Sequence, residues 1–543
     1  MNHLLTLADA VATHARLTPA KLAVRDSRRS LSYAQWHARA NRLANALLGL
    51  GLAKGDRVAL LAYNCAEWME AYAALAAAGL VAVPINFRLT PPEIAYIVQH
   101  SEARAVIAQD ELTDRIDPVR SELPVLHGAY IAFGRELPAG WRGYEALIDA
   151  ASDATPAVDV RPADMSALMY TSGTTGKPKG AMRSHEGSAL IALATALEMH
   201  FTRDDTALLV MPMCHANSLY FSQTFVHLGA TCVIDDRRSF DPEALLSTLA
   251  SQKVTFTSLV PTHYIMMLGL PAAVKAKYDV SRVEKLMISS APARRETKLA
   301  ILEHFHNGKL YELYGSTEAG WVTLLRPDEQ IDKLGSVGRE WTGSGPIRLL
   351  DPHGQEVADG EVGELFSRTP YVFDGYWKNP EKTAEAFWWP PGHGPAASAP
   401  HGGAEALGRP SDFSGAWCSV GDMARRDDHG YIHLVDRKSN MIISGGENVY
   451  PSEVEGVIGA HPKVKDVAVV GVPHDKWGES VHAVVVLHQG AVATEAELVE
   501  WCRGRIAGYK RPQSVQFVAD TDMPRTATGK ILHRTLRDRM STA

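Results

Sequence analysis

Helix-like and strand-like segments alternate through roughly the first 300 residues, and this alternation constrains the fold more than any other feature of the chain. Residues 32–48 carry apolar side chains at helical spacing and are followed by Gly49, a helix stop signal. The run RVALL comes soon after and predicts a buried strand. The same helix-then-strand order recurs at 67–83 and at 91–107. We therefore predict a layered α/β fold with parallel sheets.

The length of 543 residues is too great for a single hydrophobic core, so we expect at least two domains. Beyond Pro346 the rhythm gives way to short alternating strands, which predict a β-rich subdomain. Residues 390–415 are rich in Pro, Gly, Ala and Ser and are interpreted as a flexible surface insertion. The expected domains are a large N-terminal one of layered α/β sheets at 1–436 and a small α+β C-terminal one at 437–543.

The charge and the cysteines exclude several classes of protein. A formal net charge of −7 without a long basic run disfavours nucleic acid and anionic membranes as partners. Five scattered cysteines without a CxxC pair indicate neither a disulfide framework nor a zinc site, so we expect a reducing, cytoplasmic location. The N-terminus does not resemble a secretory signal. The longest apolar run, 71–85, is short for a membrane span, so no integral membrane association is expected.

The segment YTSGTTGKPKGA, residues 170–181, follows a short apolar run that we interpret as a strand. It combines hydroxyl groups, glycines that permit tight turns, and two lysines, which together suit a polyphosphate. A Walker loop is disfavoured because two of the glycines are too close together and Pro178 follows the first lysine. A plain Ser/Thr/Gly linker is the structural alternative, and the Lys-Pro-Lys-Gly ending disfavours it. The residues expected to hold phosphate are Thr171, Ser172, Gly173, Thr174, Thr175, Gly176, Lys177 and Lys179.

Four further segments carry residues that suit nucleotide chemistry: YELYGSTEAG at 311–320, CSVGDMARRDDHGY at 418–431, DRKSNMIISGGENVYPSEVE at 436–455 and PRTATGKIL at 524–532. Each has a plain structural explanation when it is taken alone. Their order and spacing after TSGTTGKPKG resemble the adenylate-forming superfamily, which includes the acyl-CoA synthetases, over about residues 31–536. The resemblance implies that ATP activates a carboxylic acid as an acyl adenylate and that a thiol then displaces AMP.

The resemblance also implies where ATP would bind. The 171–179 segment would hold the β- and γ-phosphates, Tyr314 would stack on adenine, and Glu318 would ligate Mg²⁺. Asp422 would accept hydrogen bonds from both ribose hydroxyls, a role that suits an ionised carboxylate, and Arg437 would contact phosphate or ribose. The other nucleotide-binding positions that the resemblance implies are Ser290, Ala291, Pro292, Gly315 and Ser316.

The implied catalytic residues are Lys530, Thr317, Glu318 and His215. Lys530 would bridge the attacking carboxylate and the α-phosphate, because two anions repel each other unless cations gather their charge. Thr317 would contact the α-phosphate. His215 would gate the carboxylate pocket, with a purely structural histidine as the alternative.

The C-terminal domain is expected to be mobile and to rotate between the two half-reactions. The implied hinge falls at Ser439, where relatives usually carry Asp or Lys, so a charge-based latch is in doubt. After the rotation, Gly445, Gly446 and Glu447 would line the tunnel for the thiol of CoA.

The nature of the acid follows from the segments expected to line its pocket, which are CHANSLYFSQ, SSAPA and AGWVTLL. They are mainly small or apolar, and no arginine is clearly placed to pair with a second carboxylate, so an apolar acid is expected. A medium-chain fatty acid is the leading prediction and an aryl acid the second. Trp321 and Tyr220 are interpreted as core residues, with the floor of an aryl pocket as the alternative.

The predicted function is that of an AMP-forming acyl-CoA synthetase with ATP, Mg²⁺ and CoA as its cofactors and a carboxylic acid as its substrate. One open alternative is a stand-alone adenylation enzyme that loads a carrier protein. Another is an inactive nucleotide-binding sensor, which the joint presence of Glu318, Asp422, Arg437 and Lys530 disfavours. A homodimer is also left open.

Overall fold

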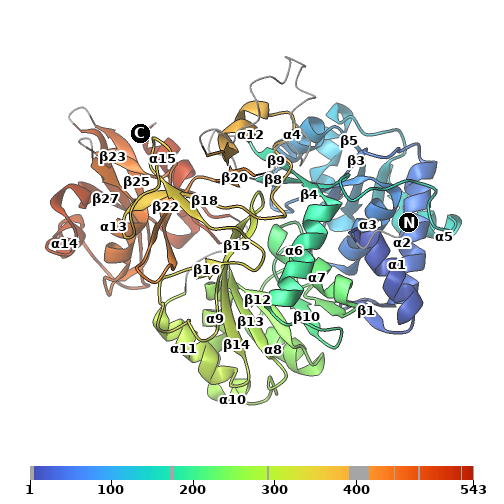
Figure 1. Ribbon diagram of the computed structural model, residues 1–543, viewed down its shortest axis with the longest axis horizontal. Helices are drawn as coiled ribbons and strands as arrows, with labels where there is room; N and C mark the ends of the chain where they lie inside the picture. The colour runs from blue at the N-terminus through green and yellow to red at the C-terminus, as the bar shows by residue number, and fades with distance from the viewer. Residues whose placement is uncertain are drawn as a thin grey trace. The chain divides into compact units, whose positions relative to one another are not determined.

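The chain forms two compact units, Met1–Pro346 with Ser367–Cys418 and, smaller, Ile347–Phe366 with Ser419–Ala543 (Figure 1). Both combine helices with sheets, which confirms the predicted α/β class with a large N-terminal and a small C-terminal part. The finer boundary at residue 437 stays a prediction, and the insertion predicted at 390–415 lies almost entirely outside the described residues. The structure, a computed structural model, describes residues 5–171, 177–289, 293–390, 415–444, 447–474, 477–526 and 529–541.

One sheet of the first unit follows the strand order β16-β15-β14-β13-β12-β10-β11-β1-β2. Its middle strands are parallel, as predicted, whereas β2, β15 and β16 pair antiparallel at its two ends. Its strands are β1 (Leu22–Arg25), β2 (Ser30–Ser32), β10 (Thr206–Leu209), β11 (Thr231–Ile234), β12 (Phe256–Leu259), β13 (Lys285–Ser289), β14 (Lys309–Ser316), β15 (Gly320–Leu325) and β16 (Arg339–Glu340).

The other large sheet of this unit follows the order β7-β6-β5-β3-β4-β8-β9 and is parallel except for the edge strand β9. A short pair, β19 (Phe387–Trp388) and β20 (Trp417–Cys418), lies apart from both sheets. The strands of the second sheet are β3 (Arg57–Leu61), β4 (Val81–Ile85), β5 (Ala103–Gln109), β6 (Tyr130–Phe133), β7 (Arg142–Gly143), β8 (Met165–Thr171) and β9 (Lys179–Ser184).

Helices cover these sheets, and local chemistry explains where several of them begin. The predicted helix at 32–48 is α2, whose cap residue Ser32 exchanges hydrogen bonds with Gln35 in a capping box. Asp241 accepts from Ala244 N at the start of α8. The helices are α1 (Leu7–Leu17), α2 (Tyr33–Gly49), α3 (Ala66–Ala78), α4 (Pro91–Ser101), α5 (Tyr144–Ala150), α6 (His185–Glu198), α7 (Ala216–Leu228), α8 (Pro242–Ser251), α9 (Pro261–Leu268), α10 (Ala272–Lys275), α11 (Arg295–His304) and α12 (Pro380–Ala386), with 3₁₀ turns at Asp110–Arg115 and Asp117–Glu122.

The second unit holds an antiparallel sheet, β17-β18-β21-β22, and a sheet β24-β23-β26-β25 in which β27 runs parallel beside β26. Its strands are β17 (Arg348–Leu350), β18 (Val362–Phe366), β21 (Asp422–Arg426), β22 (Ile432–Arg437), β23 (Ile442–Ser444), β24 (Glu447–Val449), β25 (Val464–His474), β26 (Gly478–Leu487) and β27 (Ser514–Phe517). Its helices are α13 (Pro451–Gly459), α14 (Glu495–Trp501) and α15 (His533–Ser541), with 3₁₀ turns at Gly508–Lys510 and Asp520–Asp522.

One predicted helix is shorter in the structure. The sequence pattern predicts a helix near 495–506, but α14 ends at Trp501. Gly504 then has a φ of +73°, a left-handed conformation that ends a helix, and the backbone of Arg503 bridges that of Ile506. The apolar spacing continues past the point where the backbone turns, which explains the overestimate.

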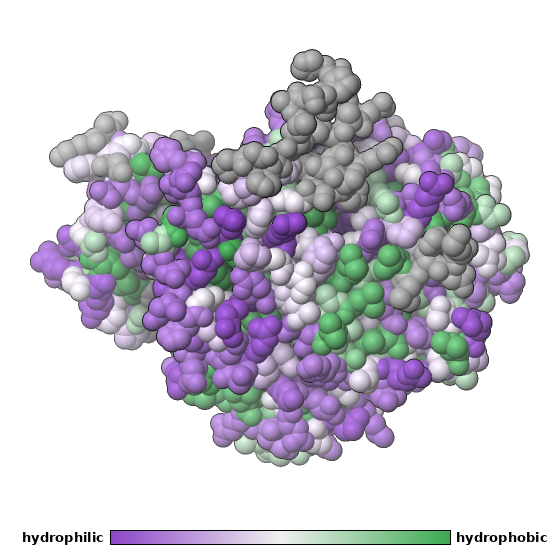
Figure 2. Space-filling model, viewed as in Figure 1, coloured by the Kyte–Doolittle hydropathy of each residue, from purple (hydrophilic) through white to green (hydrophobic). Residues whose placement is uncertain are grey.

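The core of the first unit is built mainly from α1, α2, α3, α6 and α7, where Trp36, Trp68 and Phe221 are buried. Apolar residues also reach the surface over α6, whose Leu197 is 65% exposed (Figure 2). The run 71–85 is the predicted buried helix and strand, with Gly79 in the left-handed conformation between them. Within the described part of the chain, no helix has both the length and the apolar character that a membrane span requires.

Candidate active site

The predicted phosphate loop joins two antiparallel strands at an edge of its sheet. β8 ends at Thr171 and β9 begins at Lys179, and these two residues face each other in the register of the pair. The Nζ atom of Lys177 lies 5.5 Å from the ring centroid of Tyr96, and that of Lys179 lies 4.0 Å from the ring centroid of Tyr376. The loop therefore belongs to a β-hairpin flanked by two positioned lysines. Its remaining members, Ser172, Gly173, Thr174, Thr175 and Gly176, lie outside the described residues.

Glu318, the predicted Mg²⁺ ligand, is hydrogen-bonded to this hairpin. Its Oε1 atom accepts hydrogen bonds from the Thr171 hydroxyl at 3.0 Å and from the Tyr376 hydroxyl at 2.8 Å. The residue is only 6% exposed. Its Oε2 atom makes no hydrogen bond with any described residue, so one oxygen fixes the carboxylate and the other stays available.

A buried arginine fixes the backbone around Glu318. Arg183, on β9, is 1% exposed and donates to the carbonyl oxygens of Thr317 at 3.4 Å, Glu318 at 3.3 Å and Tyr371 at 2.7 Å. A charge-assisted donor that spans three carbonyls fixes the backbone on either side of the carboxylate. Phe373 N also donates to the Glu318 carbonyl at 2.7 Å.

Tyr314, Gly315, Ser316 and Thr317 end β14 and lead into the tight turn to β15, where they are half-buried. A Cβ atom on Gly315 would lie 2.4 Å from the carbonyl oxygen of Gly320, so the turn requires glycine there. The Ser316 hydroxyl accepts from Ala319 N at 2.9 Å. Ser290, Ala291 and Pro292, the predicted adenine segment, lie outside the described residues.

His215 is the N-cap residue of α7 and has an extended backbone. Burial, together with the positive charge of Arg88, lowers the pKa of this imidazole to about 4. His215 is therefore neutral at neutral pH, so it can exchange hydrogen bonds with a carboxylate but cannot form an ion pair with it.

The second unit brings together predicted residues that lie far apart in the sequence. Asp422 and Arg437 face each other in the β21–β22 pair, and Arg437 Nε lies 2.7 Å from Asp422 Oδ1. The pKa of Lys530 is lowered by desolvation and by Arg437, whereas Asp422 and Asp436 partly offset this effect. Lys530 therefore lies within electrostatic range of the predicted ribose carboxylate.

The backbone at the predicted hinge position accepts hydrogen bonds from an arginine of α15. Ser439 follows Arg437 by two residues, and the guanidinium of Arg537 donates to the carbonyl oxygens of Ser439 at 3.3 Å and Asn440 at 3.4 Å. Glu447 is exposed at the start of β24. Its predicted companions in the thiol tunnel, Gly445 and Gly446, lie outside the described residues.

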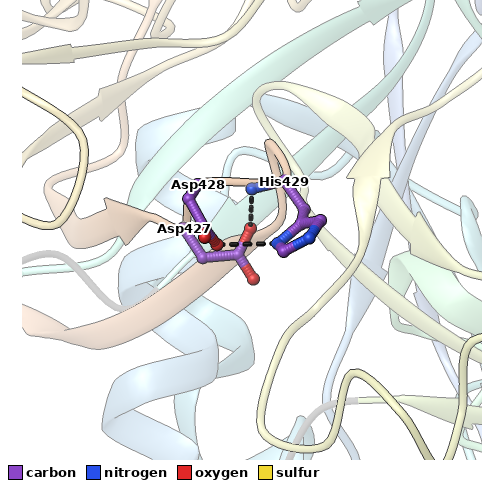
Figure 3. A group of neighbouring side chains, drawn as sticks. All are labelled: Asp427, Asp428 and His429. Carbon is purple, nitrogen blue, oxygen red and sulfur yellow. Dashed lines mark hydrogen bonds and ion pairs between the residues drawn. The ribbon is translucent and has the colours of Figure 1, made fainter.

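An acidic cluster at the β21–β22 turn has a structural explanation (Figure 3). The ligand atoms of Asp427, Asp428 and His429 lie within 4.8 Å of one another. Asp427 Oδ1 accepts from the backbone N atoms of His429 at 3.0 Å and Tyr431 at 2.9 Å, and His429 Nδ1 lies 2.7 Å from Asp428 Oδ1. These contacts close the hairpin turn, and no bound ion is needed to explain them.

Two residues of the site were missed in the sequence. Tyr376 belongs to YVFDGYW, where an aromatic side chain among other aromatics gives no sign that its hydroxyl meets a carboxylate. Arg183 gave a weak signal, because a charged residue in the short strand KGAMRS requires a buried partner. Trp321 and Tyr220 are buried, and Trp321 Nε1 donates to Thr195 Oγ1 at 2.9 Å, in keeping with the core interpretation.

Two family models match parts of the chain that carry residues of this site. Residues 11–377 match the model described as AMP-binding enzyme, and residues 453–530 match that of the AMP-binding enzyme C-terminal domain. The chain belongs to the AMP-binding enzyme family. The β8–β9 hairpin, Tyr314 and Glu318 lie in the first match, and Lys530 is the last residue of the second.

Curated relatives of this AMP-binding enzyme include acid–CoA ligases. It is 36% identical to a feruloyl-CoA synthase of Amycolatopsis sp over 97% of each chain. It is 34% identical to a long-chain-fatty-acid–CoA ligase of Mycobacterium tuberculosis over 94% of this chain and 93% of the relative. The ATP-bound structure of MatB from Rhodopseudomonas palustris superimposes with a TM-score of 0.83 at 31% identity over 99% of both chains. The predicted class, an AMP-forming acyl- or aryl-CoA synthetase, is confirmed by these relatives.

Proposed function

We propose that the enzyme couples ATP cleavage to AMP and pyrophosphate with the formation of a thioester between CoA and an apolar monocarboxylic acid. The observation that carries this proposal is the Glu318 carboxylate, which Thr171 and Tyr376 fix through Oε1 while Oε2 stays available. A carboxylate held in this way suits the cation of a nucleotide, and Lys179, whose Nζ atom lies over the ring of Tyr376, suits its phosphate.

Magnesium fits the residues of the first unit. It is a hard cation that prefers oxygen ligands and is usually held by one or two carboxylates together with substrate phosphates. The Oε2 atom of Glu318 meets that requirement. When bound, Mg²⁺ would neutralise the phosphate charge that opposes the approach of a second anion.

The residues of the chain would then have separate roles in the two steps of the reaction. Lys177 and Lys179 would bind the departing pyrophosphate, and Thr317 would contact the α-phosphate. In the second unit, Asp422 would hold the ribose hydroxyls. Lys530 would bring the substrate carboxylate to the α-phosphate in the first step. We propose that residues 437–543 then rotate about Ser439, so that Glu447 lines the path of the incoming thiol.

The pocket segments support a neutral acyl group. His215 is neutral, and the side chains of AGWVTLL are all buried, with Trp321 4% exposed. A medium-chain fatty acid and an aryl acid both meet this description, and the curated relatives include ligases named for each kind. CoA is the proposed thiol because these relatives are named as CoA ligases or synthases.

The test is to incubate the purified protein with ATP, Mg²⁺, CoA and a panel of aliphatic and aromatic acids. We expect AMP, pyrophosphate and an acyl-CoA product in equal amounts for at least one acid. Release of orthophosphate, or AMP formation that needs a carrier protein instead of CoA, would contradict the proposal. ATP that binds without turnover of any acid would favour the sensor alternative.

A cytoplasmic location is proposed as well, supported by the five cysteines, all of which are buried and scattered through the chain. Whether the enzyme is a homodimer stays a prediction, which light scattering at several concentrations would test.

A further inference from the structure

Three polar side chains meet where two of the expected pocket segments come together. Asn217 lies in the first turn of α7, two residues after His215, whereas Ser289 ends β13 immediately before the predicted adenine segment. Asn217 Nδ2 donates to Ser289 Oγ and to Ser258 Oγ, both at 3.0 Å. The two serine hydroxyls lie 3.4 Å apart, so the three groups form one cluster, which we call the Asn217 triad.

The triad lies where ligands bind in α/β proteins. β12 and β13 are adjacent parallel strands, and Ser258 and Ser289 stand at or next to their carboxyl ends. Both serines are 5% exposed, whereas Asn217 is half-buried and so remains partly accessible. The two serines thus fix the orientation of the Asn217 amide, while the partial exposure of Asn217 leaves the amide accessible to a ligand.

The free end of the amide is an acceptor. Both Nδ2 hydrogens are used by the serine hydroxyls, and Oδ1 makes no hydrogen bond with a described residue. An alkyl chain laid over this oxygen would remove it from water without replacing the lost hydrogen bond, which is unfavourable. A substrate group with an O–H or N–H would replace that bond.

We infer that Asn217 determines the acyl specificity of the enzyme by accepting a hydrogen bond from a hydroxyl or N–H group on the acid. This inference rests on the proposed function and deepens it: the preferred substrate is an apolar acid that carries one hydrogen-bond donor away from its carboxylate. It places donor-bearing aryl or ω-hydroxy acids ahead of plain medium-chain fatty acids.

The test compares matched acids in ATP–pyrophosphate exchange and in CoA-dependent AMP release. The panel is cinnamate with its hydroxy and methoxy derivatives at each ring position, and octanoate with 8-hydroxyoctanoate. We expect at least one hydroxylated acid to exceed its parent in kcat/KM by about 10-fold or more, because a site built for a hydroxyl rejects analogues that lack it. The methoxy derivative should not share this advantage, since it accepts but cannot donate a hydrogen bond.

Variants of the Asn217 triad test whether Asn217 causes the preference for hydroxylated acids. Asn217→Ala should reduce the ratio of kcat/KM for hydroxylated over parent acid by about 10-fold. Ser258→Ala should reduce it partly by loosening the amide. The matched control is Asn45→Ala, because Asn45 also lies on a helix and its Nδ2 also donates twice, to Ser152 O and Ala154 O, both at 2.8 Å. The control should leave the ratio unchanged.

The outcomes separate the two proposals. If parent acids yield thioester and Asn217→Ala leaves every ratio unchanged, the specificity inference fails while the proposed function stands. A wild-type preference for the methoxy over the hydroxy derivatives would overturn the inference as well. If none of the acids yields AMP and thioester, the proposed function itself fails.

An independent observation concerns a small cavity of the first unit. About 20 Å³ of it is available to the centre of a water molecule. Three buried polar atoms of its lining side chains have no hydrogen-bond partner: Tyr72 Oη on α3, His185 Nε2 at the start of α6 and His227 Nε2 near the end of α7.

The geometry points to one or two ordered water molecules that bridge α3, α6 and α7. A water needs roughly 10 to 15 Å³ of such space and two to four polar partners, and this cavity offers both. The bridge would join the helix that follows the phosphate hairpin to the helix that begins at His215.

A high-resolution crystal structure of the full chain tests this second inference directly. We expect water density within hydrogen-bond distance of at least two of the three atoms. An empty cavity, or side chains that turn to pair with one another, would overturn it.

Discussion

The hydroxyl of Tyr376 should contribute directly to adenylate formation, although nothing in the sequence singled it out. It donates to Glu318 Oε1 at 2.8 Å, and Thr171 supplies the second hydrogen bond to the same oxygen. The change Tyr376→Phe removes only this donor and keeps the ring that faces Lys179. The carboxylate would then be held by a single hydrogen bond and would lose its fixed orientation.

The size of the effect follows from the charge of the acceptor. A hydrogen bond to a charged group contributes about 1.5 to 3 kcal/mol, roughly twice the value for a neutral pair. Because about 1.4 kcal/mol corresponds to a factor of ten, the loss corresponds to about 10-fold to 100-fold. We expect Tyr376→Phe to lower kcat/KM for ATP by this factor and to raise the Mg²⁺ concentration needed for half-maximal exchange.

The assay is ATP–pyrophosphate exchange with the best acid of the panel at a series of Mg²⁺ concentrations. Tyr264→Phe is the matched control, because the Tyr264 hydroxyl is also buried but donates to the neutral backbone oxygen of Met287 at 3.1 Å. The control should leave the Mg²⁺ dependence unchanged. If Tyr376→Phe stays within twofold of wild type, or if both variants lose the same activity, the assigned role of the hydroxyl is refuted.

Three further predictions concern catalysis, the core and pH. Lys530→Ala should slow adenylate formation by about 10²-fold to 10³-fold but spare thioester formation from supplied acyl adenylate, and equal loss in both steps would contradict the assignment. The Lys298 ammonium lies 2.5 Å from Glu312, and neither side chain is more than 5% exposed. Lys298→Met leaves Glu312 as an unpaired buried charge, so it should lower the free energy of unfolding, measured with urea, by about 3 to 5 kcal/mol. Adding Glu312→Leu should restore most of this loss. Burial lowers the pKa of His185 from 6.5 to about 4, so below pH 6.5 the folded protein binds fewer protons than the unfolded chain. The free energy of unfolding should therefore fall as the pH drops from about 6.5 to 4, by on the order of 3 kcal/mol from this residue. Unfolding midpoints across this range should show the loss, and His185→Gln should flatten it.

Short-range sequence pattern was enough to place several helices and strands of the first unit. The run RVALL is β3, and the short apolar run before TSGTTGKPKG lies within β8. Spacing and capping chemistry act within a few residues, so the sequence records them directly. At α14 the same reasoning overran the helix end, because the turn at Gly504 interrupts an apolar spacing that continues beyond it.

What the sequence alone determined was the family and the candidate residues of its site, since TSGTTGKPKG, the turn around Glu318 and the segments that carry Asp422 and Lys530 are all contiguous motifs. What only the tertiary structure decided was how those motifs are held. The Tyr376 hydroxyl meets Glu318 across 58 residues and Asn217 meets Ser289 across 72, and such contacts depend on how strands and turns pack. Motifs are local in the chain, whereas the partners that orient a carboxylate or an amide are neighbours only in the folded protein.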